Sequence, residues 1–159
     1  MKSVYIETTI PSYLVSRSSR DLIIAGHQRI TQDWWENSLQ NYECFISRIM
    51  INEILNGEEL YAQKRLELIK NIPLLDYDDE IEHIASIYMN HFNFPEKLVR
   101  DMYHLAYSVF HEIDFLLTWN CRHLANANMR YNITRLNYEL GYKTPDICTP
   151  EELTNLEEE

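Results

Sequence analysis

Glycine is scarce in this 159-residue sequence, with only three positions. Loops that cradle phosphates, such as GxGxxG and GxxxxGK[ST], need several glycines close together, and neither pattern occurs. No apolar run approaches the ~18 residues of a membrane-spanning helix. Met1 and Lys2 lead straight into a strand pattern, so we expect no signal peptide. These absences argue against a P-loop or dinucleotide-binding protein and against a membrane protein.

Cysteine is sparse as well, and its spacing forms no framework. There are three cysteines, an odd number, and they include no CxxC pair: Cys44, Cys121 and Cys148. This predicts reduced thiols in a cytoplasmic protein.

Acidic residues outnumber basic residues, and the formal net charge is −11. This balance argues against binding nucleic acid through bulk charge, but it leaves room for a local basic patch.

Apolar residues are abundant, at 45% of the sequence. That content and the length of the chain are enough for one hydrophobic core, and no repeat or Pro/Gly/Ser-rich linker divides the chain. We therefore predict a single domain over residues 1–154. Residues 155–159 are mostly glutamate and are expected to form a solvated acidic tail.

Strand and helix patterns alternate along the chain. The strand patterns cover residues 2–8, 42–47, 72–76, 115–118 and 146–148. The helical patterns cover residues 22–39, 49–56, 58–70, 78–90, 98–111 and 126–140, with Gly141 ending the last and Thr149 capping a further helix. In these helices Leu22, Ile23 and Leu60 are expected to face inward. The alternation predicts an α/β fold: a mostly parallel sheet of four to five strands with helices on both faces.

In a parallel sheet the functional crevice lies beyond the carboxyl ends of the strands. Glu7 directly follows the first strand, Glu53 lies in the first turns of the helix after the second, and Asn120 follows the fourth. Asp101 begins the helix that leads back to that fourth strand, and the helix dipole favours a carboxylate there. These side chains should meet at one edge. Asp114 precedes its strand, so we expect it at the opposite edge without a functional role.

Three carboxylates and one amide at one edge have a specific chemical meaning. Unpaired carboxylates repel one another, and a hard divalent cation removes that conflict. Oxygen ligands of this kind suit Mg²⁺ or Mn²⁺, which can activate water and stabilise charge on phosphate oxygens during phosphodiester hydrolysis. Taken singly, Glu53 could be a solvated surface charge, Asp101 an N-cap and Asn120 a turn residue. The convergence carries the prediction.

Histidine, tryptophan and arginine residues are further candidates for the same site. The six histidines show no HExxH spacing, and we expect a structural or outer role for His104, three residues after Asp101. Trp34 and Trp35 are expected to belong to the core and the subunit surface, with a stacking platform for single-stranded RNA as the alternative. Five basic residues flank the candidate segments and form either a local phosphate-binding surface or ordinary surface charge: Arg17, Arg20, Arg48, Arg100 and Arg122.

The segments that carry these residues resemble a known family. They read VYIETTIPSYL, ISRIMINEI, RDMYHLAYS, DFLLTWNCRHLAN and GYKTPDICTPEEL, and together they span almost the whole chain. They resemble the PIN-domain family and, within it, the VapC-like toxins of type II toxin–antitoxin systems. The family's acidic positions fall on Glu7, Glu53, Asp101 and Asn120. The sequence departs from the family in having Glu7 where Asp is usual, and Asn120 where an acid is usual.

The resemblance implies a three-layer PIN-like fold and a Mg²⁺- or Mn²⁺-dependent endoribonuclease. It also implies a small antitoxin protein as partner, a homodimer, and RNA as substrate. In this interpretation Glu7 and Asp101 are direct metal ligands, Glu53 is a further ligand or a base, and Asn120 is a weaker fourth ligand through its carbonyl oxygen.

The hydroxyls of Thr8 and Thr118 are expected to support the metal ligands by hydrogen bonds. The alternative is a catalytically weak or inactive PIN-like domain that acts as a protein- or RNA-binding module, because Asn120 brings no negative charge to the site. A non-nuclease hydrolase has little support, since the sequence has no Ser or Cys nucleophile elbow.

Overall fold

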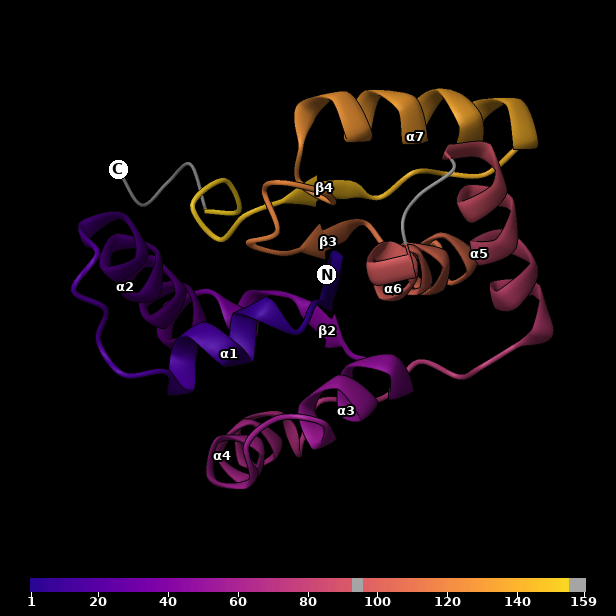
Figure 1. Ribbon diagram of the computed structural model, residues 1–159. Helices are drawn as coiled ribbons and strands as arrows, with labels where there is room; N and C mark the ends of the chain where they lie inside the picture. The colour runs from indigo at the N-terminus through magenta and orange to yellow at the C-terminus, as the bar shows by residue number, and fades with distance from the viewer. Residues whose placement is uncertain (93–95, 155–159) are drawn as a thin grey trace.

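A computed structural model describes residues 1–92 and 96–154, so the predicted acidic tail lies outside the described residues. The strands form one parallel sheet in the order β2-β1-β3-β4 (Figure 1). Val4 lies opposite both Cys44 and Phe115, which places β1 in the middle. The predicted α/β class is confirmed, with strands at β1 (Ser3–Ile6), β2 (Glu43–Phe45), β3 (Phe115–Leu117) and β4 (Asp146–Cys148).

Helices cover both faces of the sheet and make three layers (Figure 1). Two short 3₁₀ helices, η1 (Leu39–Asn41) and η2 (Glu96–Leu98), lie among them. The α-helices are α1 (Thr9–Val15), α2 (Leu22–Asn37), α3 (Arg48–Leu55), α4 (Glu59–Ile69), α5 (Asp79–Phe92), α6 (Val99–Phe110) and α7 (Ala127–Leu140). Each predicted helix from residue 22 to residue 140 therefore has an observed counterpart.

Two cores flank the sheet because strand side chains alternate between its faces. In β1, Tyr5 packs into the core shared with α5, α6 and α7. Its neighbours Val4 and Ile6 pack into the other core, with α1, α2, α3 and α4. All of these strand residues are fully buried. A strand that is apolar on both faces is the signature of a central strand in a parallel sheet.

Local sequence sets where α2 and α7 begin and end. The Asp21 side chain accepts hydrogen bonds from the Ile23 and Ile24 amides at the start of α2. Asn126 caps α7 in the same way. Gly141 ends α7 with φ of 82°, a left-handed conformation that glycine adopts without steric cost, so the predicted end of this helix is confirmed.

Two predicted elements are wrong. Residues 72–76 form no strand: Leu74 makes only an isolated bridge to Ile46, beside an Ile46 amide that donates to the Pro73 carbonyl at 3.1 Å. Pro73 has no amide hydrogen to extend the ladder. Thr149 begins a single turn and not a helix, although the Glu152 carboxylate accepts from the Thr149 amide as in a capping box.

The predicted inward side of α2 and α4 is also wrong in part. Leu22 and Ile23 are 88% and 71% exposed, and Leu60 on α4 is 57% exposed. The buried stripe of α2 contains Gln28, Thr31 and Trp34, and its two polar members are hydrogen-bonded. Apolar periodicity does not detect such a face.

The structure shows whether Trp34 packs in the core or could stack against RNA bases. It is 2% exposed, and its indole N–H donates to the Leu153 carbonyl at 2.9 Å, so it belongs to the core and is no stacking platform. Within the described residues, the helices are too short or too polar to cross a membrane.

Candidate active site

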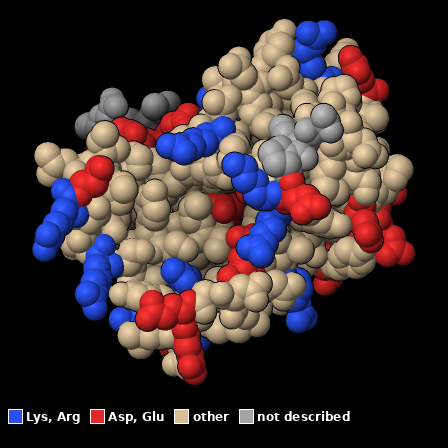
Figure 2. Space-filling model, viewed as in Figure 1, with Lys and Arg blue, Asp and Glu red and all other residues tan. Residues whose placement is uncertain are grey.

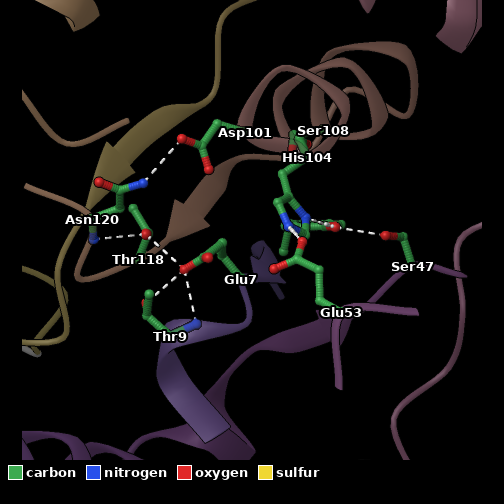
Figure 3. Close-up of polar contacts among 10 residues, drawn as sticks. Glu7, Thr9, Ser47, Glu53, Asp101, His104, Ser108, Thr118 and Asn120 are labelled. Carbon is green, nitrogen blue, oxygen red and sulfur yellow. Dashed lines mark hydrogen bonds and ion pairs between the residues drawn. The ribbon is translucent and has the colours of Figure 1, made fainter. Parts of the chain in front are cut away.

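The predicted residues meet at the carboxyl edge of the sheet. Glu7 follows β1, Asn120 follows β3, Asp101 lies in the first turn of α6, and Glu53 lies in α3 after β2. Figure 3 shows their side chains around one shared space. Asp114 lies at the other end of β3, where its carboxylate accepts from the Ser3 amide at 2.9 Å. The connectivity of a parallel sheet therefore brings together residues up to 113 positions apart in the chain.

Glu7 is held rigidly from both sides. Its side chain is buried, and one oxygen, Oε2, accepts hydrogen bonds from the Thr9 amide at 3.0 Å, the Thr9 hydroxyl at 2.5 Å and the Thr118 hydroxyl at 2.8 Å. Within the described residues, the other oxygen, Oε1, takes no hydrogen bond. Three donors on one oxygen fix the carboxylate and leave its second oxygen for a ligand in the shared space.

Asp101 and Asn120 form a pair across the space. The Asn120 amide nitrogen donates to Asp101 Oδ2 at 3.1 Å, and the Asn120 backbone N–H donates to the Thr118 hydroxyl at 3.0 Å. This geometry turns the Asn120 amide oxygen away from Asp101, since a carboxylate can only accept. Burial, and then the nearby charge of Glu7, raise the pKa of Asp101 to about 6.

Glu53 is bound to a buried histidine. His104 is fully buried in α6, and its Nε2 lies 2.5 Å from Glu53 Oε1. Burial alone would lower the pKa of His104, but Glu53, Glu7 and Asp101 together raise it. Burial likewise works against ionising Glu53, yet the hydrogen bond and charge of His104 hold the pKa of Glu53 below its ordinary value. Both shifts favour the charged forms of the two side chains, which strengthens the hydrogen bond between them.

The residues present fit a divalent cation. One ligand atom from each of Glu7, Glu53 and His104 lies within 4.8 Å of the others. The Thr8 hydroxyl is buried and completes no well-formed hydrogen bond among the described residues, although it is near enough to Glu53 to help lower the pKa of that carboxyl. Burial, and then the charges of Glu7 and Glu53, raise the pKa of Asp101, so its ionised form is disfavoured in the same space. A cation would relieve both conditions.

The flanking arginines are exposed: Arg17, Arg20, Arg48, Arg100 and Arg122. Arg100 lies within electrostatic range of Glu53 and contributes to its lowered pKa. Figure 2 shows acidic side chains recessed in the middle of one face, with basic side chains on the surrounding surface. A rim of this kind could contact the phosphates of a polyanion whose backbone crosses the acidic space.

Sequence reasoning missed several residues that hold the site. Thr9 supplies two of the three donors to Glu7, a local contact between positions two apart that the Glu-Thr-Thr sequence could have indicated. Ser47 and Tyr5 bond to each other and lead to His104, and nothing in their sequence context signals it. The spacing of Asp101 and His104, three apart on one helix face, was the available signal for His104.

Comparisons with known proteins identify the fold. A scan against protein-family models finds no match, and no curated protein matches the sequence. Several solved structures match nearly the whole chain. VapBC-1 from nontypeable Haemophilus influenzae matches with a TM-score of 0.59 and 13% identity, over 94% of this chain and 98% of the matched chain.

VapBC2 from Rickettsia felis, solved with a DNA fragment from its promoter, matches with a TM-score of 0.58 and 12% identity, over 92% of this chain and 98% of the matched chain. FitAcB from Neisseria gonorrhoeae matches with a TM-score of 0.57 and 12% identity, over 94% and 99%. The resemblance to VapC-like PIN domains therefore holds at the level of the fold.

Proposed function

We propose that this protein is a Mg²⁺- or Mn²⁺-dependent endoribonuclease and the toxin of a type II toxin–antitoxin pair in the cytoplasm. The observation that carries the proposal is the convergence of Glu7, Glu53 and Asp101 on one space, with the pKa of Asp101 raised by burial and by the charge of Glu7. Bringing carboxylates together in a partly buried space destabilises the fold unless a cation compensates their charge. The shared fold with VapBC and FitAcB chains supports the same class.

The roles of the residues follow from their contacts. Glu7 presents its free Oε1, and Asp101 its carboxylate, as direct metal ligands. Asn120 points its amide nitrogen at Asp101, so its amide group would have to rotate before the amide oxygen could bind the cation as a weaker fourth ligand. Glu53 either completes the ligand set or accepts a proton from the attacking water. A divalent cation held there would polarise a phosphate oxygen and make a water molecule more acidic. The hydroxyls of Thr9 and Thr118 hold the Glu7 carboxylate in place by hydrogen bonds, and the exposed arginines would contact RNA phosphates on either side.

Metal-dependent RNA cleavage by the purified protein tests the proposal. We expect Mn²⁺ or Mg²⁺ to support cleavage of single-stranded RNA, and Asp101→Asn to abolish it without unfolding the protein. Glu139→Gln is the matched control, because Glu139 is an exposed acid near the end of α7, at the opposite edge of the sheet. Cleavage by Asp101→Asn at the wild-type rate would overturn the assignment.

The partners are part of the proposal. The neighbours VapBC and FitAcB are complexes, and we propose that this chain likewise binds a small antitoxin protein and forms a homodimer. Co-expression with the product of an adjacent small gene should suppress cleavage and yield a complex on size exclusion. A toxin that remains active and unbound in the presence of that product would contradict the pairing.

A binding module without catalysis is the second candidate. It is favoured by Asn120, which donates to Asp101 where a fourth acid would carry charge, and by the net charge of −11. Calorimetric titration separates the two functions. The module is supported if no Mn²⁺ binds at millimolar concentration while RNA or a protein partner still binds, and it is excluded if Mn²⁺ binds and cleavage follows.

A further inference from the structure

A chain of buried hydrogen bonds leads from the strand edge to Glu53. Ser47 Oγ lies 2.7 Å from Tyr5 OH, Tyr5 OH lies 2.5 Å from His104 Nδ1, and His104 Nε2 lies 2.5 Å from Glu53 Oε1. Ser47, Tyr5 and His104 are fully buried, and they come from the N-cap of α3, from β1 and from α6 respectively. Figure 3 shows Ser47, His104 and Glu53 of this chain beside Glu7, with Glu53 as the member that faces the shared space.

This chain places several polar groups in the protein core, where apolar side chains are usual. Burying polar groups costs free energy unless each is hydrogen-bonded, and apolar residues of similar size would pack there without that condition. Ser47 also departs from its local role: it is the N-cap residue of α3, yet its side chain makes no capping hydrogen bond and turns to Tyr5 instead. A polar network that breaks a local folding rule points to function.

The contacts define what the chain does to Glu53. Both ring nitrogens of His104 are engaged, so the ring cannot turn. Oε1 of Glu53 is tied to that fixed ring, and the carboxylate is thereby oriented with its second oxygen free of His104. Outer contacts that orient a metal ligand in this way typically change metal affinity by about 10- to 100-fold when they are removed.

We propose that His104, held by Tyr5 and Ser47, is a positioning residue that orients Glu53 toward the cation shared with Glu7 and Asp101. This inference rests on the proposed metal site. It assigns Nε2 of His104 to Glu53 and not to the cation. Direct coordination by His104 is the competing arrangement, because its Nε2 lies within the cluster of possible ligand atoms, and it would require breaking the 2.5 Å contact to Glu53.

Mn²⁺ affinity measured by calorimetry on a set of variants tests the role. His104→Phe removes the contact to Glu53 and should weaken Mn²⁺ binding by about 10- to 100-fold. His104→Gln keeps an N–H donor at the same reach and should stay within a few-fold of wild type. Tyr5→Phe frees the ring at its far side and should give an intermediate loss. The matched control is Ser108→Ala, a buried residue on α6 that donates only to the His104 carbonyl, and it should bind Mn²⁺ like wild type.

Pulsed electron paramagnetic resonance on the Mn²⁺-loaded wild-type protein adds an independent readout. The positioning role predicts no nitrogen coupling of a directly bound imidazole, and observing that coupling would overturn it. Unchanged Mn²⁺ affinity in His104→Phe would also overturn it, as would equal losses in His104→Phe and Ser108→Ala. If His104→Phe does not fold, His104→Gln, Tyr5→Phe and the resonance spectrum still decide. Folded wild-type protein that binds no Mn²⁺ would refute the proposed function itself.

Discussion

Asp101→Asn should stabilise the metal-free protein while destroying its metal site. In the folded chain, burial and the charge of Glu7 raise the pKa of Asp101 from 3.8 to about 6. The folded protein therefore holds a proton on Asp101 in a pH range where the unfolded chain has lost it. As the pH rises from about 4 to about 6, the folded state loses stability relative to the unfolded state, and above that window the loss is complete.

The size of the effect follows from the shift. A pKa difference of one unit between the folded and unfolded states corresponds to about 1.4 kcal/mol. Ionising Asp101 in the folded protein therefore costs at most about 3 kcal/mol at pH 7. Partial solvent contact lowers this figure, and we expect a gain of about 1–3 kcal/mol for Asp101→Asn. The substituted amide oxygen can still accept from Asn120, whose donor lies 3.1 Å away, so the contact between the two side chains survives.

Urea unfolding in the presence of a chelator measures the gain. Wild type, Asp101→Asn and the control Glu139→Gln should be compared at pH 4.5 and pH 7.5, with stability taken from the midpoint and slope. Asp101→Asn should exceed wild type at pH 7.5 by the amount above and by much less at pH 4.5, while the control tracks wild type. A gain that is absent, or equal at the two pH values, would refute the electrostatic reasoning.

Adding Mn²⁺ should reverse the order of stability. A ligand that binds only the folded state stabilises it by about 2.7 kcal/mol at a concentration a hundred times its Kd. Wild type should gain this stabilisation, and Asp101→Asn should gain little because it lacks one anionic ligand. A variant that is more stable without metal and less stable with it would show that the acidic cluster is maintained for binding and not for folding.

Three further outcomes are expected. Asn120→Asp should raise Mn²⁺ affinity in calorimetry and lower metal-free stability in urea by about 1–3 kcal/mol, because a fourth carboxylate would face Asp101. Thr118→Val should cost about 1.5–3 kcal/mol in the same assay by removing a donor to Glu7, whereas Thr118→Ser should cost far less. Arg100→Gln, placed in the inactive Asp101→Asn background, should weaken single-stranded RNA binding and reduce its salt slope by about 0.7; an unchanged slope would remove Arg100 from the phosphate surface.

The sequence predicts the frame of the site because chain connectivity determines it. Parallel strands joined by helices must bring Glu7, the start of α6 and Asn120 to one edge, whatever the packing details. The same rule places Asp114 at the opposite edge, where it lies. Residues whose position depends on topology alone are therefore within reach of sequence reasoning.

The hydrogen-bonded interior of the site is beyond that reasoning. Tyr5 lies in an apolar strand and reads as a core residue, yet its hydroxyl pairs with residues 42 and 99 positions away. The exposed Leu22 and the buried, hydrogen-bonded Thr31 of α2 fail for the same reason. Whether a side chain is buried with a hydrogen-bond partner depends on residues that are distant in sequence and that only folding brings close. Apolar periodicity does not predict such partners.

Asn120 illustrates both points: chain topology predicts its position, and only the folded structure shows its hydrogen bond. Topology places it at the carboxyl edge of the sheet, and the resemblance to a family of nucleases would assign it an acid. The structure shows what an amide does there: it donates to Asp101, which an ionised acid could not do, and so relieves part of the repulsion that raises the pKa of Asp101. An amide at this position, in place of a carboxylate, stabilises the metal-free fold and leaves one anionic ligand fewer to hold a cation. The proposed metal site should therefore be weaker and the metal-free protein more stable, and Asn120→Asp should move these two properties in opposite directions.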